Sequence, residues 1–585
     1  MIRNPEFRIQ NPKAKATSIL DSEFRILNST RGKISRNLRV QEERVHNIRV
    51  SRRTFVSAAA APFVAGLGRR TPSFGQKYWA DQLPDAPGEN WLTYHGDYSG
   101  RRFSRLAAIS RANVKRLQAV WVYQAEGTSR QECTPVVRDG VMYVTASNIV
   151  YALDACAGRK IWEYRAELPE GIKPEVNRGV ALSEHRLFFA TADCRLIALD
   201  ARNGSRVWEA RVADHRKEYR LTQAPLVIKD KVVIGMGYGD WGARGYLDCY
   251  DQATGALVWR FWTVPRPGDP FSETWPEANN AWENGGGCTW MTGTYDREAN
   301  LVYWGTGNPA PDFYGEGRTG DNLLTNCVVA LDADTGERRW HFQFTPHDTN
   351  DWDACECPMH VDAAWRGRPR KLLVEANRNG FFYVLDRITG EYLLGKVFAT
   401  QTWARGLDPK GRPIVIEGTD PTPAGVKVCP TVEGASNWMS PSYSPRYGLY
   451  YVVAQDGCNI YASSSAPFQE GKNTYMGTGT QRLPGDPARM FIRALELQTG
   501  EKRWERPMLG SEWSWGGTLA TAGDLVFVGD AAGNLVAHDA EKGDALWHFY
   551  TGRDLSASPM TYASSGRQFV ALASGSAIFT FALPE

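Results

Sequence analysis

Residues 151–162 read Tyr-Ala-Leu-Asp-Ala-Cys-Ala-Gly-Arg-Lys-Ile-Trp, and the same pattern returns at intervals through the rest of the chain. In each copy an acidic residue and a Gly lie four positions apart, and a Trp or Leu follows four positions after the Gly. Each copy predicts a strand, a tight turn with a positive φ at the Gly, and a return strand carrying a large apolar side chain. The other copies are Asp200…Gly204…Trp208, Asp251…Gly255…Trp259, Asp332…Gly336…Trp340, Asp386…Gly390…Leu394, Glu496…Gly500…Trp504 and Asp539…Gly543…Trp547.

Trp121 supplies an eighth equivalent position, without a turn of its own. Eight positions predict an all-β fold, an eight-bladed β-propeller of four-stranded antiparallel blades in which each Trp packs between neighbouring sheets. We expect this propeller to span residues 76–585. Two long intervals, 259–340 and 394–504, break the period, and insertions in a propeller map to loops on one face. We therefore expect the functional residues to be concentrated near these two intervals.

The charge of the chain is unevenly distributed. Residues 1–75 hold 15 Lys and Arg against 5 Asp and Glu, which leaves 53 against 60 in the remainder. The expected folded part is therefore mildly acidic, which argues against a nucleic-acid partner because such proteins usually present a basic face.

The basic segment 1–75 is predicted to be a leader. Arg52 and Arg53 precede a short, weakly apolar run over residues 57–67, a pattern typical of a twin-arginine export signal. The run is too short to span a bilayer, and we expect a periplasmic protein without a membrane span. A chance Arg pair in a basic tail is the alternative, and residues 1–50 are read as a disordered lead-in or an over-extended gene start.

The ten Cys are scattered singly, apart from Cys355 and Cys357. We interpret this close pair as structural, because its spacing fits no strong metal or redox template. The other pairings cannot be deduced from the sequence. No C-x-x-C-H motif occurs, so this sequence encodes no covalent c-type haem.

Several strings within the repeat region resemble those of the pyrroloquinoline quinone (PQQ)-dependent alcohol dehydrogenases, soluble methanol and ethanol type. The resemblance covers roughly residues 88–575, and its specificity lies in the order of the strings within an eightfold repeat. They are Trp91-Leu-Thr-Tyr-His-Gly-Asp-Tyr-Ser-Gly100, Thr222-Gln-Ala-Pro225, Gly305-Thr-Gly-Asn-Pro-Ala-Pro311, Pro346-His-Asp348, Asn377-Arg-Asn-Gly380 and Thr518-Leu-Ala-Thr-Ala-Gly523.

The resemblance implies PQQ, a flat quinone with three carboxylates, as the cofactor. Arg178 then meets one cofactor carboxylate with its guanidinium, and Thr222 hydrogen-bonds another. Glu132 lies beside the quinone, Trp290 stacks beneath it, and Arg378 stands near the quinone oxygens. A loop-bracing Arg178 and a surface Glu132 remain the alternatives. The resemblance implies further cofactor contacts at Gly237, Tyr238, Gly239, Cys288, Gln455 and Trp515.

The resemblance also implies a metal ion bound by Asp240, Asn308 and Asp351. Such oxygen ligands suit Ca²⁺ or another hard ion. Asp353 matches the extra carboxylate of lanthanide-using members, and a third carboxylate compensates the charge of a trivalent ion. We therefore expect a lanthanide ahead of Ca²⁺. The alternatives are a turn-capping Asn308 and a loop-capping Asp353. On an extended segment, Asp351 and Asp353 would face the same side.

The sequence departs from the family in several places. Ile172 and Lys173 stand where many members have two adjacent disulfide-bonded Cys above the cofactor, so an aliphatic side chain covers that face or it is more open. Asp240 replaces a usual Glu, Cys288 a common Thr, and Gln455 a common Asn. The missing ring of paired Cys at positions 172 and 173 puts cofactor tightness and electron transfer in doubt, whereas the changes at Cys288 and Gln455 are tolerable changes of donor.

The implied reaction is oxidation of a small primary alcohol to an aldehyde. Asp351 is expected to take the alcohol proton while hydride moves to the quinone, and Arg378 to stabilise the developing negative charge. Electrons are then expected to reach a separate cytochrome c, and a homodimer remains open. A sugar or aldose quinoprotein is one alternative, and a non-catalytic propeller scaffold is the other.

Overall fold

The structure, a computed structural model, describes residues 83, 85–173, 175–277, 279–471, 474–485, 487–510 and 513–585. The chain divides into two units, Met1–Pro72 and Ser73–Glu585, and the described residues all belong to the second. The predicted leader, including Arg52 and Arg53, lies outside the described residues.

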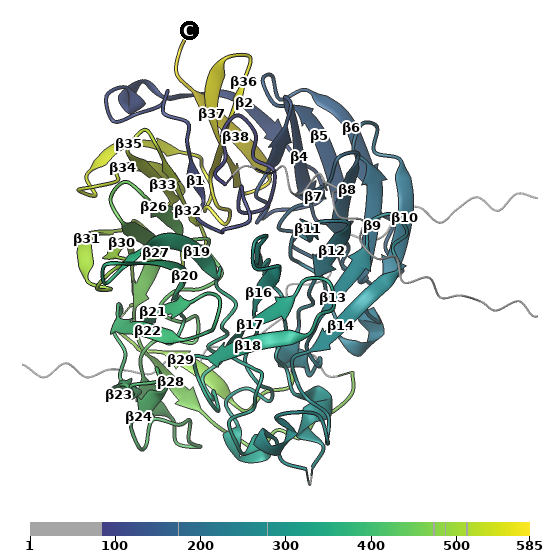
Figure 1. The fold of residues 1–585 in the computed structure, drawn as a ribbon, viewed down its shortest axis with the longest axis vertical. Coiled ribbons are helices and arrows are strands. Elements are labelled where there is room, and N and C mark those ends of the chain that lie inside the picture. The colour runs from purple at the N-terminus through teal and green to yellow at the C-terminus, as the bar shows by residue number, and fades with distance from the viewer. Residues whose placement is uncertain are drawn as a thin grey trace, which may run out of the picture. The chain divides into compact units, whose positions relative to one another are not determined.

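The described chain contains eight sheets of four or five strands. Figure 1 shows how they are arranged. Seven of them run consecutively along the sequence. Their strands are β3(Val136–Arg138), β4(Val141–Ala146), β5(Ile149–Asp154), β6(Lys160–Arg165); β7(Ala181–Leu182), β8(Arg186–Ala190), β9(Arg195–Asp200), β10(Arg206–Arg211); β11(Leu226–Ile228), β12(Lys231–Ile234), β13(Tyr246–Asp251), β14(Leu257–Trp262); β15(Thr294–Asp296), β16(Leu301–Gly305), β17(Cys327–Asp332), β18(Arg338–Gln343); β19(Met359–Trp365), β20(Arg368–Ala376), β21(Phe381–Asp386), β22(Tyr392–Val397); β26(Ser442–Ser444), β27(Leu449–Asp456), β30(Arg489–Glu496), β31(Lys502–Pro507); and β32(Thr518–Thr521), β33(Leu525–Gly529), β34(Asn534–Asp539), β35(Ala545–Tyr550).

The eighth sheet joins the two ends of the propeller. β2 (Gln118–Gln124) pairs antiparallel with β38 (Ala577–Ala582), and β37 (Arg567–Ser574) and β36 (Met560–Ser564) complete the sheet. The register places Gln118 opposite Ala582. An early strand and the last strand of the chain therefore close the ring, and the prediction of eight four-stranded blades is confirmed.

One repeat shows why the pattern produces these blades. Asp332 ends β17, and its carboxylate accepts hydrogen bonds from the backbone N–H groups of Asp334 and Thr335, which closes the turn. Gly336 has a φ of +72°, and a Cβ there would lie 2.6 Å from the ring of Trp259 in the preceding blade. The Trp259 indole N–H donates to Ala333 O at 3.2 Å. The predicted Trp docking between blades is therefore confirmed.

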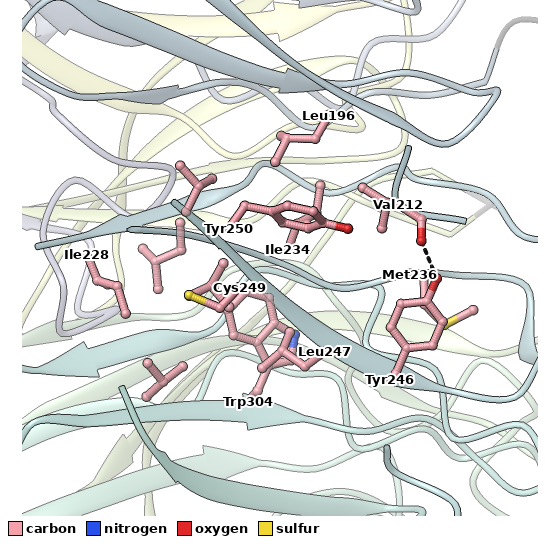
Figure 2. Packing of buried hydrophobic residues seen from close by; sticks show 14 of the residues in the cluster. Leu196, Val212, Ile228, Ile234, Met236, Tyr246, Leu247, Cys249, Tyr250 and Trp304 are labelled. Atoms are coloured by element: carbon pink, nitrogen blue, oxygen red, sulfur yellow. Dashed lines mark hydrogen bonds between the residues drawn. The ribbon is translucent and has the colours of Figure 1, made fainter. Parts of the chain in front are cut away.

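The core lies between the sheets. Figure 2 shows part of one cluster, with Leu196, Ile234, Leu247 and Trp304 packed together. All four are fully buried. The central strands are apolar in near-continuous runs because both faces of each blade pack against a neighbour.

The two long intervals hold irregular insertions, as predicted. The second contains the β-ladders β23(Ala404–Leu407)–β24(Pro413–Val415) and β25(Val426–Val428)–β28(Asn459–Ala462)–β29(Gly479–Arg482). β1 (Phe103–Ser104) pairs parallel with β32 and is the fifth strand of that sheet. Short 3₁₀ helices complete the structure at η2(Val114–Arg116), η3(His215–Lys217), η4(Gly239–Trp241), η5(Ser272–Thr274), η6(Ala281–Asn284) and η7(Gly315–Arg318). None of the helices among the described residues has the length and apolar character that a membrane span requires.

Candidate active site

A cavity of about 240 Å³ opens on one face of the propeller. Its residues come before the first strand of a blade or after the second. In an antiparallel sheet these two points lie at the same end of the strands. The lining residues are Glu175, Val176, Arg178, Thr222, Gly237, Tyr238, Gly239, Asp240, Trp241, Cys288, Trp290, Asn308 and Asp353. Ten of these thirteen were predicted from the sequence as cofactor or metal contacts.

Arg178 is buried and crosses one end of this cavity. Its Nη2 lies 2.6 Å from a Glu132 carboxylate oxygen, and its Nη1 donates to the Thr222 hydroxyl at 2.8 Å. The guanidinium lies over the rings of Trp290 and Trp438, 5.1 and 4.6 Å from their centroids. Within the described part of the chain, Nε of Arg178 has no hydrogen-bond partner. This end of the cavity is therefore suited to an anionic, flat ligand.

Trp438 was missed in the sequence, because it belongs to no copy of the repeat. Its ring is stacked on Trp515 with centroids 5.9 Å apart, and Trp515 is stacked on Trp513 at 5.4 Å. Neither Trp438 nor Trp515 lines the cavity, and Trp515 is connected to the lining residue Arg178 through Trp438.

The predicted carboxylate pair meets one guanidinium. Arg378 Nη1 lies 2.7 Å from Asp353, and its Nη2 lies 3.6 Å from Asp351. The segment is not extended as expected, since Asp351 has a φ of +60°. Burial raises the pKa of Asp351 well above its usual range, and the nearby Arg378 opposes that rise. A carboxyl with a raised pKa is a stronger base and is suited to accept a proton.

Asp353 is held from two further sides. The backbone N–H of Asn308 donates to one of its oxygens at 2.8 Å, and the Trp290 indole N–H donates to the other at 3.2 Å. Asp240, on η4, faces the same cavity. Burial, together with the charge of Asp353, raises the pKa of Asp240 to about 7. Several carboxyl groups therefore gather at this end of the cavity.

Asp312 is a further carboxylate that the sequence did not single out. It is buried, and one of its oxygens accepts a hydrogen bond from the Asn308 side-chain amide at 2.6 Å. Burial and the charge of Asp240 raise its pKa well above the usual range. The only signal in the sequence was its place, directly after the Gly305–Pro311 string.

The backbone near the cavity is closely packed. A Cβ on Gly237 would lie 3.4 Å from Trp290, and one on Gly239 would lie 3.3 Å from the Cys288 sulfur. The Tyr238 hydroxyl donates to Glu175 at 2.8 Å across the cavity wall. Larger side chains at the two glycines would press on the Trp290 side of the cavity.

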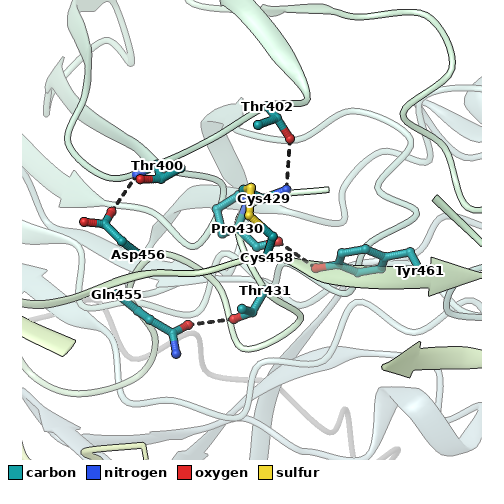
Figure 3. The surroundings of a disulfide bond; sticks show 9 residues. All are labelled: Thr400, Thr402, Cys429, Pro430, Thr431, Gln455, Asp456, Cys458 and Tyr461. Atoms are coloured by element: carbon teal, nitrogen blue, oxygen red, sulfur yellow. Dashed lines mark hydrogen bonds between the residues drawn. A yellow bond between two sulfur atoms is a disulfide. The ribbon is translucent and has the colours of Figure 1, made fainter. Parts of the chain in front are cut away.

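Gln455 lies elsewhere. Its side-chain oxygen accepts a hydrogen bond from Thr431 at 2.6 Å near the disulfide Cys429–Cys458, as Figure 3 shows. Gln455 and Cys458 line a second cavity of about 180 Å³. The sequence left the disulfide pairing open. Cys355 and Cys357 are buried free thiols.

Residues 172 and 173, where many family members have paired Cys, lie away from the cavity. Ile172 is half-buried and Lys173 is exposed, and neither lines the cavity. Glu175 and Val176 line it instead.

The donor atoms suit a hard cation together with a chelating cofactor. Among the described residues, no three carboxylate, imidazole or thiol groups converge closely enough to hold an ion by themselves. However, Asp240, Asn308, Asp351 and Asp353 offer oxygen donors, and one buried oxygen of Asp312 has no hydrogen-bond partner within the described part of the chain. Oxygen donors with excess negative charge are what Ca²⁺ and similar ions require. These oxygen atoms could supply part of a coordination shell, which a bound ligand would complete.

Comparison with known proteins places the cavity in a family context. A family model described as "PQQ: Glucose/ethanol/alcohol dehydrogenase, beta-propeller domain" matches residues 91–397 and 491–570, and the first stretch contains every residue that lines the cavity. The quinoprotein alcohol dehydrogenase PedH of Pseudomonas putida is 37% identical over 508 residues, 81% of this chain and 84% of the relative. The quinohemoprotein alcohol dehydrogenase ADH IIB of Pseudomonas putida is 38% identical over 522 residues, 85% of this chain and 75% of the relative.

Two solved structures have the same fold. The quinohemoprotein alcohol dehydrogenase of Comamonas testosteroni has a TM-score of 0.80 and 36% identity, covering 85% of this chain and 82% of that one. A europium-containing methanol dehydrogenase has a TM-score of 0.79 and 29% identity, covering 85% and 98%.

Proposed function

Because this chain belongs to the family of PQQ-dependent alcohol dehydrogenases, we propose that it oxidises a primary alcohol to an aldehyde at the cavity beside Trp290. The observation that carries the proposal is the placement of two carboxylates, Asp351 and Asp353, on the buried Arg378 next to that cavity. A base and a fixed positive charge are thus held together where a flat quinone has room to lie.

Some of the residues would bind the cofactor, and others would take part in proton transfer. Arg178 and Thr222 would hold a cofactor carboxylate, and Trp290 would offer its ring as a platform. PQQ, when bound, supplies the quinone that accepts hydride from the alcohol carbon. Asp351 takes the hydroxyl proton on a carboxylate oxygen, and the Arg378 guanidinium offsets the negative charge that develops nearby.

A metal ion belongs to the same proposal. Asp240, Asn308, Asp351 and Asp353 would hold it, and we expect a lanthanide ahead of Ca²⁺ because a third carboxylate favours the higher charge. The similarity to a europium-containing methanol dehydrogenase supports this order. The ion would act as a Lewis acid toward the quinone.

The remaining proposals concern the cellular context. Arg52 and Arg53 support export to the periplasm by the twin-arginine route. Electrons would pass to a separate cytochrome c, since this sequence contains no C-x-x-C-H motif. A homodimer is compatible with these features.

A sugar substrate is the second candidate, because the matching family model includes glucose dehydrogenases. The relatives named above are alcohol dehydrogenases, which favours an alcohol. A non-catalytic scaffold would have no need of a buried Arg378 shared by two carboxylates.

The experiment compares Asp351→Asn with wild type after loading both with PQQ and La³⁺ or Ca²⁺. We expect the variant to retain PQQ, followed by its absorbance, but to lose at least about 100-fold in dye-linked alcohol oxidation, in line with the contribution of general bases. Asp334→Asn, at an exposed aspartate that pairs with Lys229, is the matched control and should keep full activity. Turnover by Asp351→Asn close to that of wild type would overturn the assignment of the base.

A further inference from the structure

Asp312 has a carboxylate that is only half used. Its side chain is buried, with 1% of the residue exposed. One oxygen accepts the 2.6 Å hydrogen bond from the Asn308 amide, and the other has no hydrogen-bond partner within the described part of the chain. A buried, unpaired carboxylate oxygen is costly, which points to a role beyond packing.

The first oxygen determines which way the Asn308 amide is turned. Because the NH₂ group donates to Asp312, the amide oxygen is directed to the other side. A flipped amide would place its oxygen against the Asp312 carboxylate, which is repulsive. The backbone N–H of Asn308 is bound to Asp353 at 2.8 Å. Asn308 is therefore anchored between two carboxylates.

One segment, residues 475–477, is hydrogen-bonded to the backbones of both Asp312 and Asp240. The Gly477 N–H donates to Asp312 O at 2.7 Å, and the Tyr475 N–H donates to Asp240 O at 2.6 Å. Met476 forms a parallel bridge with Asp312. Asp312 is thus tied to the same wall that carries the candidate ligand Asp240.

Near the cavity, there are more Asp carboxyl groups than Arg side chains paired with them. Arg378 pairs with Asp351 and Asp353. The buried Arg318 is close enough to Asp312 to act on its charge, but its N–H groups donate to Pro311 O, Asn322 and Asp348 O. Beside a bound ion, ionised Asp312 and Asp240 would add negative charge that a trivalent ion offsets better than a divalent one.

We propose that Asp312 is a positioning residue of the metal site, which directs the Asn308 amide oxygen toward the ion and whose charge favours a trivalent over a divalent ion. The inference rests on the metal site of the proposed function. Partners that orient a metal ligand in this way typically contribute about 10- to 100-fold in metal affinity.

Two substitutions separate the two roles. Asp312→Asn keeps an acceptor for the Asn308 amide and removes the charge, whereas Asp312→Leu removes both. Glu316→Gln is the matched control, because Glu316 is exposed, lies four residues further along and loses the same charge. Binding is measured without activity, by Tb³⁺ luminescence excited through tryptophan, with La³⁺ and Ca²⁺ as competitors in the presence of PQQ.

We expect Asp312→Asn to lose about 10-fold in La³⁺ affinity and less in Ca²⁺ affinity, so that the preference for La³⁺ falls. Asp312→Leu should weaken both ions by about 10- to 100-fold. If Asp312→Leu does not fold, the change in preference in Asp312→Asn decides. Affinities of Asp312→Asn for both ions within twofold of wild type and of Glu316→Gln would overturn the inference. A wild-type protein that binds neither ion would instead contradict the metal site of the proposed function.

Discussion

At the scale of single residues, the cavity depends on buried charges that compensate one another. Arg178 pairs with Glu132 at one end, and Arg378 pairs with Asp351 and Asp353 at the other. Removing one member of a buried pair leaves the other charge without compensation, which costs more than the loss of an exposed pair.

Replacing Arg178 by Met tests this at the cofactor end. The variant leaves Glu132 with Arg130, 2.9 Å away, as its remaining charged partner among the described residues. We expect the free energy of unfolding to fall by about 3 kcal/mol, the lower end of the range for breaking a buried pair, and PQQ binding to be lost. Urea unfolding and cofactor absorbance measure the two effects.

Arg165→Met is the matched control, because the Arg165 side chain is 49% exposed and its partner Glu126 is 75% exposed. It should change the free energy of unfolding by less than about 1 kcal/mol and leave PQQ binding intact. Equal effects of the two variants would contradict the role given to burial.

Glu375, near the end of β20, makes the stability of the folded protein depend on pH. Burial raises its pKa from 4.5 to about 8, and the Asn377 amide, 2.9 Å away, opposes the rise. The folded state holds this proton more tightly than the unfolded chain, so stability falls as the pH rises from about 4.5 to 8.

We therefore expect Glu375→Gln to be more stable than wild type above pH 8, with the difference shrinking toward pH 5. Denaturant midpoints measured across this range on the cofactor-free protein provide the check. Midpoints of wild type and variant that run parallel at all pH values would rule out titration of Glu375.

The sequence predicted many of these residues but not all. Thr222 and Asn308 lie in family strings, and both line the cavity together with the predicted Arg178. Asp312 and Trp438 lie outside any string or repeat, and they reach the site only through tertiary packing. Gln455 lies in the second long interval, as predicted for functional residues, yet its side chain is hydrogen-bonded to Thr431 and does not line the cavity beside Trp290.

At the scale of elements, the Trp–Gly contact joins one blade to the next. It requires an absent Cβ at the Gly and a left-handed turn. The copy with Leu394 lacks the Trp, and there the Gly500 turn packs on Lys396 and Phe382 of that blade instead. The repeat therefore predicts the contact well wherever both residues are present.

Gly336→Ala measures this contact. The new Cβ would lie 2.6 Å from the Trp259 ring, and Ala would be forced to a φ of +72°. We expect a loss of about 2–5 kcal/mol in the free energy of unfolding, from backbone strain plus overpacking. Gly566→Ala is the matched control, since Gly566 has a φ of +76° but nothing within 4 Å. It should lose only the strain, about 1–2 kcal/mol, and a loss equal to that of Gly336→Ala would contradict docking.

The insertions show what the repeat could not predict. The ladders β23–β24 and β25–β28–β29 have no counterpart in the pattern, because their strands lie in two irregular segments, one between β22 and β26 and the other between β27 and β30. The disulfide Cys429–Cys458 joins a residue next to β25 to one next to β28, and only the folded insertion brings them together.

At the scale of the whole molecule, the ring closes between distant parts of the chain. Trp121 lacked a turn in the sequence because the other strands of its sheet, β36 to β38, come from the far end. Trp547 completes the circle, with its indole N–H donating to Leu117 O at 3.0 Å. Closure leaves one face on which loops from several blades meet, and the cavity lies there.

We propose that this cavity binds PQQ and that the protein oxidises a primary alcohol there. The most direct measurement is dye reduction by the purified protein loaded with PQQ and either La³⁺ or Ca²⁺, with primary alcohols and glucose as substrates. We expect retained quinone absorbance and turnover of an alcohol that depends on both PQQ and the ion. Protein that retains no quinone absorbance, or that turns over glucose but no alcohol, would contradict the proposed function.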